Sequence, residues 1–142
     1  MKRKIIIVDD SAINLQIGLN VLKNDYDVRT VPSGEKLFQL LERITPDIIL
    51  LDIQMPEMDG FEVIQRLKSN PQTSLIPVIF MTSSNSIKFE EQCFTMGAAD
   101  FMHKPYYGPF LIKRIETHLQ TGFSEKKIQE YEEKLLKSQK AL

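Results

Sequence analysis

The strongest constraint on the fold is a fivefold alternation between short apolar runs and amphipathic stretches. Three runs, Ile5 to Val8, Ile48 to Leu51 and Val78 to Met81, contain no polar alternation. Runs of this kind are typical of parallel strands that are covered on both faces. Residues 28–31 and 101–102 are weaker candidates for two further strands.

Between the strands, apolar residues recur at helical spacing and predict helices with one buried side each. A further helix is expected over residues 87–96, with Cys93 buried in it and Gly97 as its C-terminal stop. Regular alternation of strand and helix implies right-handed crossovers. We therefore expect an α/β domain: a doubly wound five-stranded parallel sheet with helices on both faces. The predicted buried stripes are Ile13, Ile17 and Val21; Leu37, Leu40, Leu41 and Ile44; Phe61, Ile64 and Leu67; and Leu111, Ile115 and Leu119.

Charge and hydropathy narrow the possible environments. The formal net charge is -1, so nothing global attracts the protein to nucleic acid or to an anionic membrane. No apolar run approaches the ~20 residues that a membrane span requires. The single cysteine cannot form an internal disulfide and fits a reducing compartment. We expect a cytoplasmic protein in which this segment contacts neither nucleic acid nor membrane.

The composition changes after Gly122, where the chain becomes rich in Glu, Lys and Gln. Ser124 is a candidate N-cap for a helical extension over residues 123–142, which leaves residues 1–122 as the α/β domain. Apolar residues in the extension occur at heptad-like spacing, with polar Ser138 in the same seam. Two interpretations stay open: a solvated terminal helix, or a coiled-coil linker that carries a dimer or an output domain beyond residue 142. The apolar seam positions are Ile128, Tyr131, Leu135 and Leu142.

Polar residues follow the predicted strands at the edge of the sheet where ligands bind in folds of this class. Asp9 and Asp10 follow the first strand, Asp52 ends the third, Thr82 ends the fourth and Lys104 follows the fifth. Taken singly, each has an ordinary structural explanation as a cap, a strand end or a solvated cation. Together, three carboxylates on one rim would repel one another unless a cation or a proton intervenes. Mg²⁺ suits such a set of carboxylate oxygens, with the Lys104 ammonium as a fixed positive charge opposite.

These motifs, in this order and spacing, resemble the signature of the receiver domains of bacterial two-component response regulators. The resemblance covers about residues 4–119, and the segment from Asp52 to Gly60 is its most specific part. It implies the flavodoxin-like strand order 2-1-3-4-5. It also implies that a histidine kinase or a histidine phosphotransfer protein donates a phosphoryl group. The matching motifs are Asp9-Asp10-Ser11, Asp52-Ile53-Gln54-Met55-Pro56-Glu57-Met58-Asp59-Gly60, Thr82-Ser83 and Lys104-Pro105.

The same resemblance implies a role for each matching residue at the rim. Asp52 would be the phosphoacceptor and would bind Mg²⁺ (or Mn²⁺) directly, together with Asp10 and the main-chain carbonyl of Gln54. Asp9 would hold the ion through water. Lys104 would pair with a phosphoryl oxygen. The chain would then be a signalling domain that catalyses only its own phosphorylation and dephosphorylation.

The resemblance also implies a switch. The Thr82 hydroxyl would move toward the phosphoryl group, and Phe101 would change from an exposed to a buried rotamer. This change would alter the surface formed by the fourth helix, fifth strand and fifth helix, through which a homodimer could form. Pro105 fits a cis peptide after Lys104. We expect a positive φ at Gly60 to permit the tight path into the third helix.

Other interpretations are weaker. His103 and His118 have no partner at metal-binding or catalytic spacing, so we expect both to be structural. A docking receiver that ignores phosphate has no support from the sequence, because every chemical position is present. A magnesium-dependent phosphohydrolase of the haloacid dehalogenase type would need an acidic residue two positions after its nucleophile. In this chain Ser11, which is not acidic, stands two positions after Asp9. These motifs do not identify the cognate kinase or the output domain. They also do not specify the lifetime of the phosphoryl group or the oligomeric state.

Overall fold

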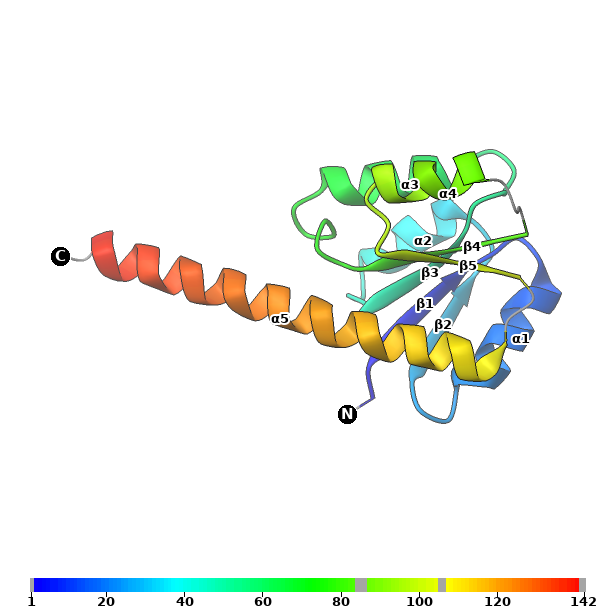
Figure 1. The fold of residues 1–142 in the computed structure, drawn as a ribbon, viewed down its shortest axis with the longest axis horizontal. Helices are drawn as coiled ribbons and strands as arrows, with labels where there is room; N and C mark the ends of the chain where they lie inside the picture. The colour runs from blue at the N-terminus through cyan, green and yellow to red at the C-terminus, as the bar shows by residue number, and fades with distance from the viewer. Residues whose placement is uncertain (1, 84–86, 105–106, 141–142) are drawn as a thin grey trace.

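The computed structural model describes residues 2–83, 87–104 and 107–140, and in these ranges it has five parallel strands and five helices. The strand order is β2-β1-β3-β4-β5, which confirms the flavodoxin-like order. Figure 1 shows α2, α3 and α4 on one side of the sheet and α1 and α5 on the other. The strands are β1 (Lys4–Val8), β2 (Asp27–Val31), β3 (Ile48–Asp52), β4 (Val78–Thr82) and β5 (Asp100–His103). The helices are α1 (Ala12–Leu22), α2 (Gly34–Leu41), α3 (Gly60–Ser69), α4 (Ile87–Thr95) and α5 (Gly108–Lys140).

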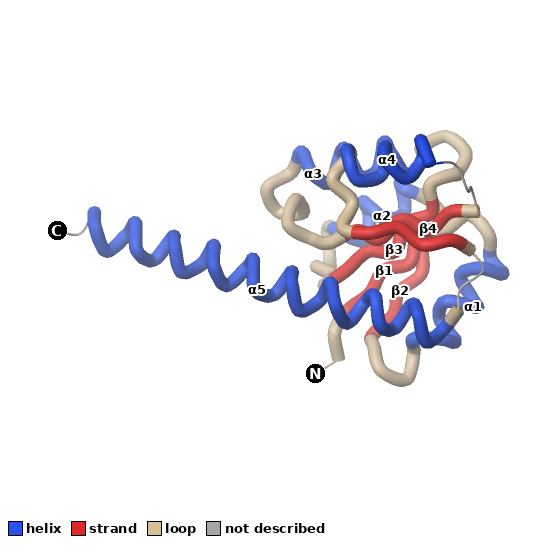
Figure 2. The backbone as a smooth tube through the Cα atoms, viewed as in Figure 1, coloured by secondary structure: helices blue, strands red, loops and turns tan. Residues whose placement is uncertain are grey.

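The hydrophobic core has two layers because alternate strand residues face opposite sides of the sheet. On β1, Ile6 and Val8 join the layer beneath α2, α3 and α4, whereas Ile5 and Ile7 join the layer beneath α1 and α5. Cys93 of α4 is fully buried in the first layer, as predicted. The helices thus cover both faces of the sheet, as Figure 2 shows.

The predicted buried stripe of α1 is wrong for two of its three residues, since Val21 packs against the core but the other two do not. Ile13 is 73% exposed and Ile17 is 39% exposed, while Gly18 and Leu22 are the buried residues of this helix. α1 is apolar around most of its circumference, so spacing alone did not identify the inward side. Its orientation is set by the packing of Leu22 against the core layer that also contains the α5 residues.

The C-terminal helix also differs from the sequence-based prediction. α5 continues through Gly122 without a break, so no new helix begins at Ser124. The division into residues 1–122 and 123–142 remains a prediction, because one helix joins the two segments. Within the described ranges, none of the helices is both long and apolar enough to cross a lipid bilayer.

The smaller predictions for α2 and α4 have mixed outcomes. α2 ends at Leu41, so Ile44 lies past the helix, although its backbone N–H still donates to the Leu40 carbonyl. Gly97 follows α4 with a φ of 95°, a conformation that suits glycine and confirms it as the C-terminal stop.

Candidate functional site

The carboxyl ends of β1 and β3 bring three carboxylates together. β1 and β3 are adjacent, and their register pairs Val8 with Leu51, which places Asp9 and Asp52 side by side at the rim. Carboxylate oxygens of Asp9, Asp10 and Asp52 all lie within 4.8 Å of one another. Asp9 and Asp52 are buried, and Asp10 is exposed. The cluster is thus open to solvent on the Asp10 side.

Lys104 reaches the same cluster from the end of β5. Its backbone N–H donates to the Thr82 carbonyl at 2.8 Å, which extends the pairing of β4 and β5 by one residue. Its Nζ lies 2.9 Å from Asp9 Oδ2 and 3.1 Å from Asp52 Oδ1, and its side chain is only 16% exposed. The structure therefore brings together the four charged residues that the sequence placed at this rim.

The electrostatic balance of the cluster is incomplete, because among the described side chains one ammonium group faces three carboxylates. Burial, reinforced by the negative charge of Asp9, raises the pKa of Asp52 to about 6, although the hydrogen bond from Lys104 opposes the shift. Burial would lower the pKa of Lys104, but its bonds to Asp9 and Asp52 outweigh that effect and raise it. The Asp52 carboxylate is thus held in a site that disfavours its charge.

Local backbone features fix this geometry. The Asp9 carboxylate accepts the backbone N–H of Ser11 at 2.9 Å, and Ser11 in turn caps α1. Gly60 begins α3, and its N–H donates to the Ile53 carbonyl at 2.8 Å. A Cβ at Gly60 would lie 2.6 Å from the Asp52 carbonyl oxygen, so close approach to β3 requires glycine here. The expected positive φ is wrong for Gly60; among the described residues it occurs at Glu57 and Gly97.

The donor set suits a hard divalent cation. Three carboxylates offer oxygen ligands within one small volume, and the single ammonium leaves them short of positive charge. Gln54 follows two residues after Asp52 with an exposed side chain. Pro105, with its expected cis peptide, lies outside the described residues, so that prediction is not tested.

The sequence as a whole decides the family. Residues 5–116 match the family model described as the response regulator receiver domain. This chain belongs to that family. Receiver domains are signalling domains of two-component systems, and the match covers the sheet and all the rim residues described above.

The closely similar proteins carry the receiver domain as one part of a longer chain. A probable cyclic di-GMP phosphodiesterase of Vibrio cholerae is 42% identical over 85% of this chain, which spans 27% of that protein. A DNA-binding dual master transcriptional regulator of Synechocystis is 36% identical over 84% of this chain, which spans 49% of that protein. The chain thus covers at most about half of either relative.

Solved structures agree with the receiver assignment. A putative response regulator from Chloroflexus aurantiacus superposes with a TM-score of 0.81 at 28% identity, covering 84% of this chain and 99% of the other. The signal receiver domain of a histidine kinase from Syntrophus aciditrophicus gives a TM-score of 0.77 at 30% identity, covering 84% of this chain and 91% of the other.

Two residues that the receiver resemblance links to switching lie on neighbouring strands. Thr82 ends β4 and is 3% exposed. Phe101 lies on β5 opposite Phe80 and is half-buried, so its ring is in neither of the two extremes that we expected. The Phe101 ring contacts Phe94 of α4 edge-on, with ring centroids 5.7 Å apart, and His103 at 5.5 Å.

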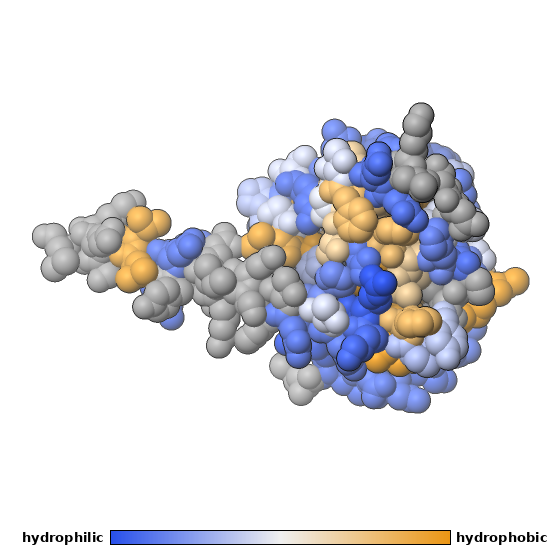
Figure 3. Space-filling view, in the orientation of Figure 1, coloured by the Kyte–Doolittle hydropathy of each residue, from blue (hydrophilic) through white to orange (hydrophobic). Residues whose placement is uncertain are grey.

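Phe101 opens onto an apolar groove on the surface of the receiver domain. The groove has a volume of about 460 Å³ and lies where α4, β5 and α5 meet, as Figure 3 shows on the face turned to the viewer. Phe94 and Phe110 at its margin are 52% and 63% exposed. The side chains that line it include Phe94, Phe101, Met102, Tyr107, Phe110 and Arg114.

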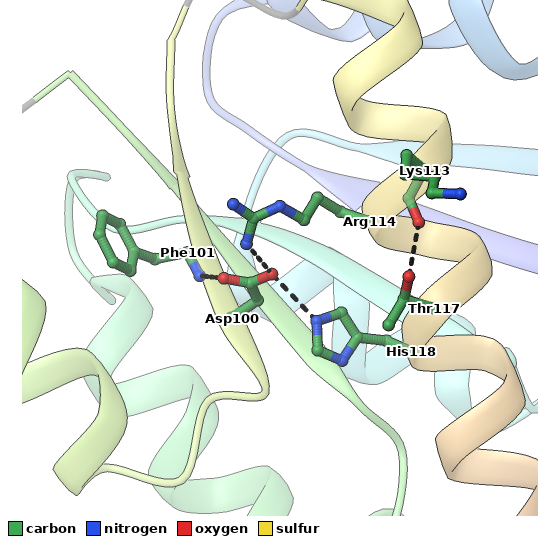
Figure 4. Close-up of polar contacts among 6 residues, drawn as sticks. All are labelled: Asp100, Phe101, Lys113, Arg114, Thr117 and His118. Carbon is green, nitrogen blue, oxygen red and sulfur yellow. Dashed lines mark hydrogen bonds and ion pairs between the residues drawn. The ribbon is translucent and has the colours of Figure 1, made fainter.

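A second charged cluster ties β5 to α5, and the sequence did not predict it. Asp100 is 7% exposed and accepts from Arg114 Nη1 at 2.6 Å and from the backbone N–H of Phe101 at 2.8 Å. His118 Nε2 lies 3.0 Å from the same carboxylate, a contact between α5 and β5 that agrees with the structural role expected of this histidine (Figure 4). Burial alone would raise the pKa of Asp100, but the bonds from His118 and Arg114 hold it below its ordinary value.

Helical spacing on α5 was the available signal for this second cluster. Arg114 and His118 are four residues apart and therefore share one side of the helix. That spacing predicts a common partner but does not identify Asp100 on a neighbouring strand.

Proposed function

We propose that this receiver domain is a phosphorylation-controlled switch that accepts a phosphoryl group on Asp52 from a histidine kinase or a histidine phosphotransfer protein. The observation that carries the proposal is the position of Asp52, buried at the end of β3 and within reach of both Lys104 and the other two carboxylates. This arrangement provides a nucleophilic oxygen, a fixed cation and metal-binding groups in one place. Those are the components that phosphoryl transfer requires.

In the proposed reaction, an Asp52 carboxylate oxygen attacks the phosphorus atom of the donor. A bond forms between that oxygen and phosphorus, while the bond from phosphorus to the donor nitrogen breaks and its electron pair stays with the donor. The Lys104 ammonium lies where it can pair with a phosphoryl oxygen once its bond to Asp52 is released. The product is an aspartyl phosphate, in which a phosphoryl group with up to two negative charges replaces the single charge of the carboxylate.

A divalent cation fits the donor set of this site. Asp10, Asp52 and the main-chain carbonyl of Gln54 would hold Mg²⁺ (or Mn²⁺), with Asp9 holding it through water. When bound, the ion neutralises charge on the transferring group and aligns it for attack. Asp9 remains paired with Lys104 and with the Ser11 N–H, which keeps its carboxylate oriented toward the cluster.

The response would pass from the rim to the groove through Thr82 and Phe101. Thr82 ends the strand next to β3, and its hydroxyl would turn to the phosphoryl oxygens. Space freed at Thr82 would allow Phe101 to turn inward and reshape the groove. The domain would then control an output domain or a partner protein in the cytoplasm, while output chemistry such as phosphodiester hydrolysis or DNA binding would belong to other segments.

Phosphorylation by a small-molecule donor tests this proposal without knowledge of the kinase. The protein is incubated with acetyl phosphate and Mg²⁺, and borohydride reduction followed by peptide mass spectrometry locates the acyl phosphate. We expect modification at residue 52 that disappears with Asp52→Asn or with chelation of the metal. Asp100→Asn is a matched control, since it alters another buried aspartate and should leave labelling unchanged. Absence of label in the wild type, or equal labelling of Asp52→Asn, would refute the proposal.

A further inference from the structure

α5 continues well beyond the part of the helix that packs on the sheet. Among the side chains that the structure describes, Leu119 is the last of α5 in the core layers, yet the helix continues to Lys140. At about 1.5 Å per residue, it extends about 30 Å past Leu119. Figure 1 shows this segment projecting away from the sheet and its helices. Most of the stability of helices in proteins comes from packing against other elements, so a partner helix would stabilise this segment.

Exposed leucines occur on the projecting segment. Leu135 is 49% exposed and Leu136 is 56% exposed, and the described residues around them, Glu132, Glu133 and Lys134, are all exposed. The two leucines are equivalent in chemistry and exposure. They differ in their position around the helix, because adjacent residues point about 100° apart at 3.6 residues per turn.

Heptad spacing assigns only one of these leucines to a seam. Ile128, Tyr131 and Leu135 follow one another at intervals of three and four residues, and Leu142 lies seven residues after Leu135. This is the a and d pattern of a two-stranded coiled coil. Leu136 falls at position b, outside the seam. Ser138 occupies a d position, which weakens the seam and predicts a modest affinity.

The charged residues beside the seam select the partner and its direction. With Leu135 at position a, Lys127 falls at g and Glu132 at the following e. In a parallel pair of identical helices, each g residue faces the following e residue of the other helix, so Lys127 meets Glu132 twice. In an antiparallel pair, g faces g and e faces e, which places like charges together. The pattern is therefore complementary to a second, parallel copy of itself.

From this pattern we propose that the projecting part of α5 forms a parallel, in-register, two-stranded coiled coil with a second copy of the chain. The two receiver domains then lie at the same end of the coiled coil. The proposal does not depend on phosphorylation of Asp52, and its test uses no phosphodonor, so the two proposals can fail separately.

Sedimentation equilibrium of the full chain tests the seam. Measurements extend to about 1 mM protein, where even a Kd of about 1 mM gives substantial dimer. We expect a monomer–dimer equilibrium in the wild type. Leu135→Glu should weaken it at least tenfold, whereas Leu136→Glu, the matched control, should change it less than twofold. A wild type that stays monomeric, as it would if the helix packed on another protein instead, overturns the proposal, and so do equal effects of the two substitutions.

Cross-linking tests the direction. Ile128→Cys and Leu135→Cys, made in separate proteins, should both form intermolecular disulfides under mild oxidation, because a parallel in-register pair places each residue opposite its copy. An antiparallel pair can bring at most one of these positions opposite itself. The unsubstituted protein, in which Cys93 is buried, gives the background level of disulfide cross-linking. Cross-linking at only one position, or at neither, overturns the parallel arrangement.

Charge exchange tests the register. Lys127→Glu and Glu132→Lys should each weaken the dimer, and the double substitution should restore it to within about threefold of the wild type. A double variant as weak as either single variant would contradict the proposed pairing.

Discussion

The domain contains two clusters built around a buried aspartate, and their charge balances are opposite. At the rim, Lys104 pairs with both Asp9 and Asp52, Asp10 adds a third carboxylate, and the pKa of Asp52 is raised to about 6. Between β5 and α5, one carboxylate receives Arg114, His118 and a backbone N–H, and its pKa is lowered. The first cluster has less positive than negative charge, which suits it to bind a cation and a reacting group. The second is neutralised internally and serves to hold two elements together.

The largest expected effect is the loss of the single ammonium from the rim. Lys104→Met leaves the buried Asp9 and Asp52 carboxylates without their cation, and we expect the free energy of unfolding to fall by about 3 kcal/mol in metal-free buffer. Mg²⁺ should restore more stability to this variant than it adds to the wild type. Urea denaturation with and without Mg²⁺ measures both quantities.

Lys113→Met, on the exposed side of α5, is the control for that experiment and should change stability by less than about 0.5 kcal/mol. If Lys104→Met were equally mild in metal-free buffer, the rim would not be short of positive charge.

An intermediate effect is expected at the second cluster. Asp100→Asn removes a carboxylate that is hydrogen-bonded to the Arg114 guanidinium and to His118, and it should lower the free energy of unfolding by about 2 kcal/mol at pH 7. Because the pKa of Asp100 is lower in the folded state than its ordinary 3.8, this stability is present above pH 3.8 and is lost as the pH falls through the folded pKa. The difference between variant and wild type should therefore shrink in acid. A constant difference across that range would contradict the assigned charge balance.

The smallest effect has the opposite sign. In the presence of a chelator at pH 8, Asp52→Asn should raise the free energy of unfolding by about 1 kcal/mol. This gain is smaller than the free energy that corresponds to the full pKa shift of Asp52, because Lys104 loses a partner. The folded pKa of about 6 exceeds the ordinary 3.8, so the folded state is penalised fully above pH 6 and not at all below pH 3.8. The gain should fade between these values. A destabilised Asp52→Asn at pH 8 would show that the rim carboxylate is well compensated.

The sequence predicted the rim better than it predicted the rest of the surface. Asp9, Asp52 and Lys104 converge because parallel strands end at one edge, a rule that needs only the strand positions. The second cluster joins residues on β5 and α5 that are up to 18 positions apart, and no such rule pairs them. For α1, an apolar residue on nearly every side removed the contrast that spacing needs, and so Ile13 and Ile17 were misplaced.

At Gly60 the residue was identified correctly but the reason was wrong. A sequence shows that glycine is present, but it does not distinguish a positive φ from a close approach to a neighbouring strand. The Asp52 carbonyl oxygen, 2.6 Å from a hypothetical Cβ, is the reason in this fold. Likewise, the unbroken course of α5 through Gly122 depends on helix continuity that local composition does not reveal.

The contrast between the two clusters can be tested directly by an NMR titration of the isotope-labelled protein with Mg²⁺. We expect saturable shifts of the amide signals of Asp9, Asp10 and Asp52. The signals of Asp100 and Phe101 should shift less, and none of these responses should remain in Asp52→Asn. Signals at the rim that do not move, or a direct response at Asp100 that survives Asp52→Asn, would contradict it.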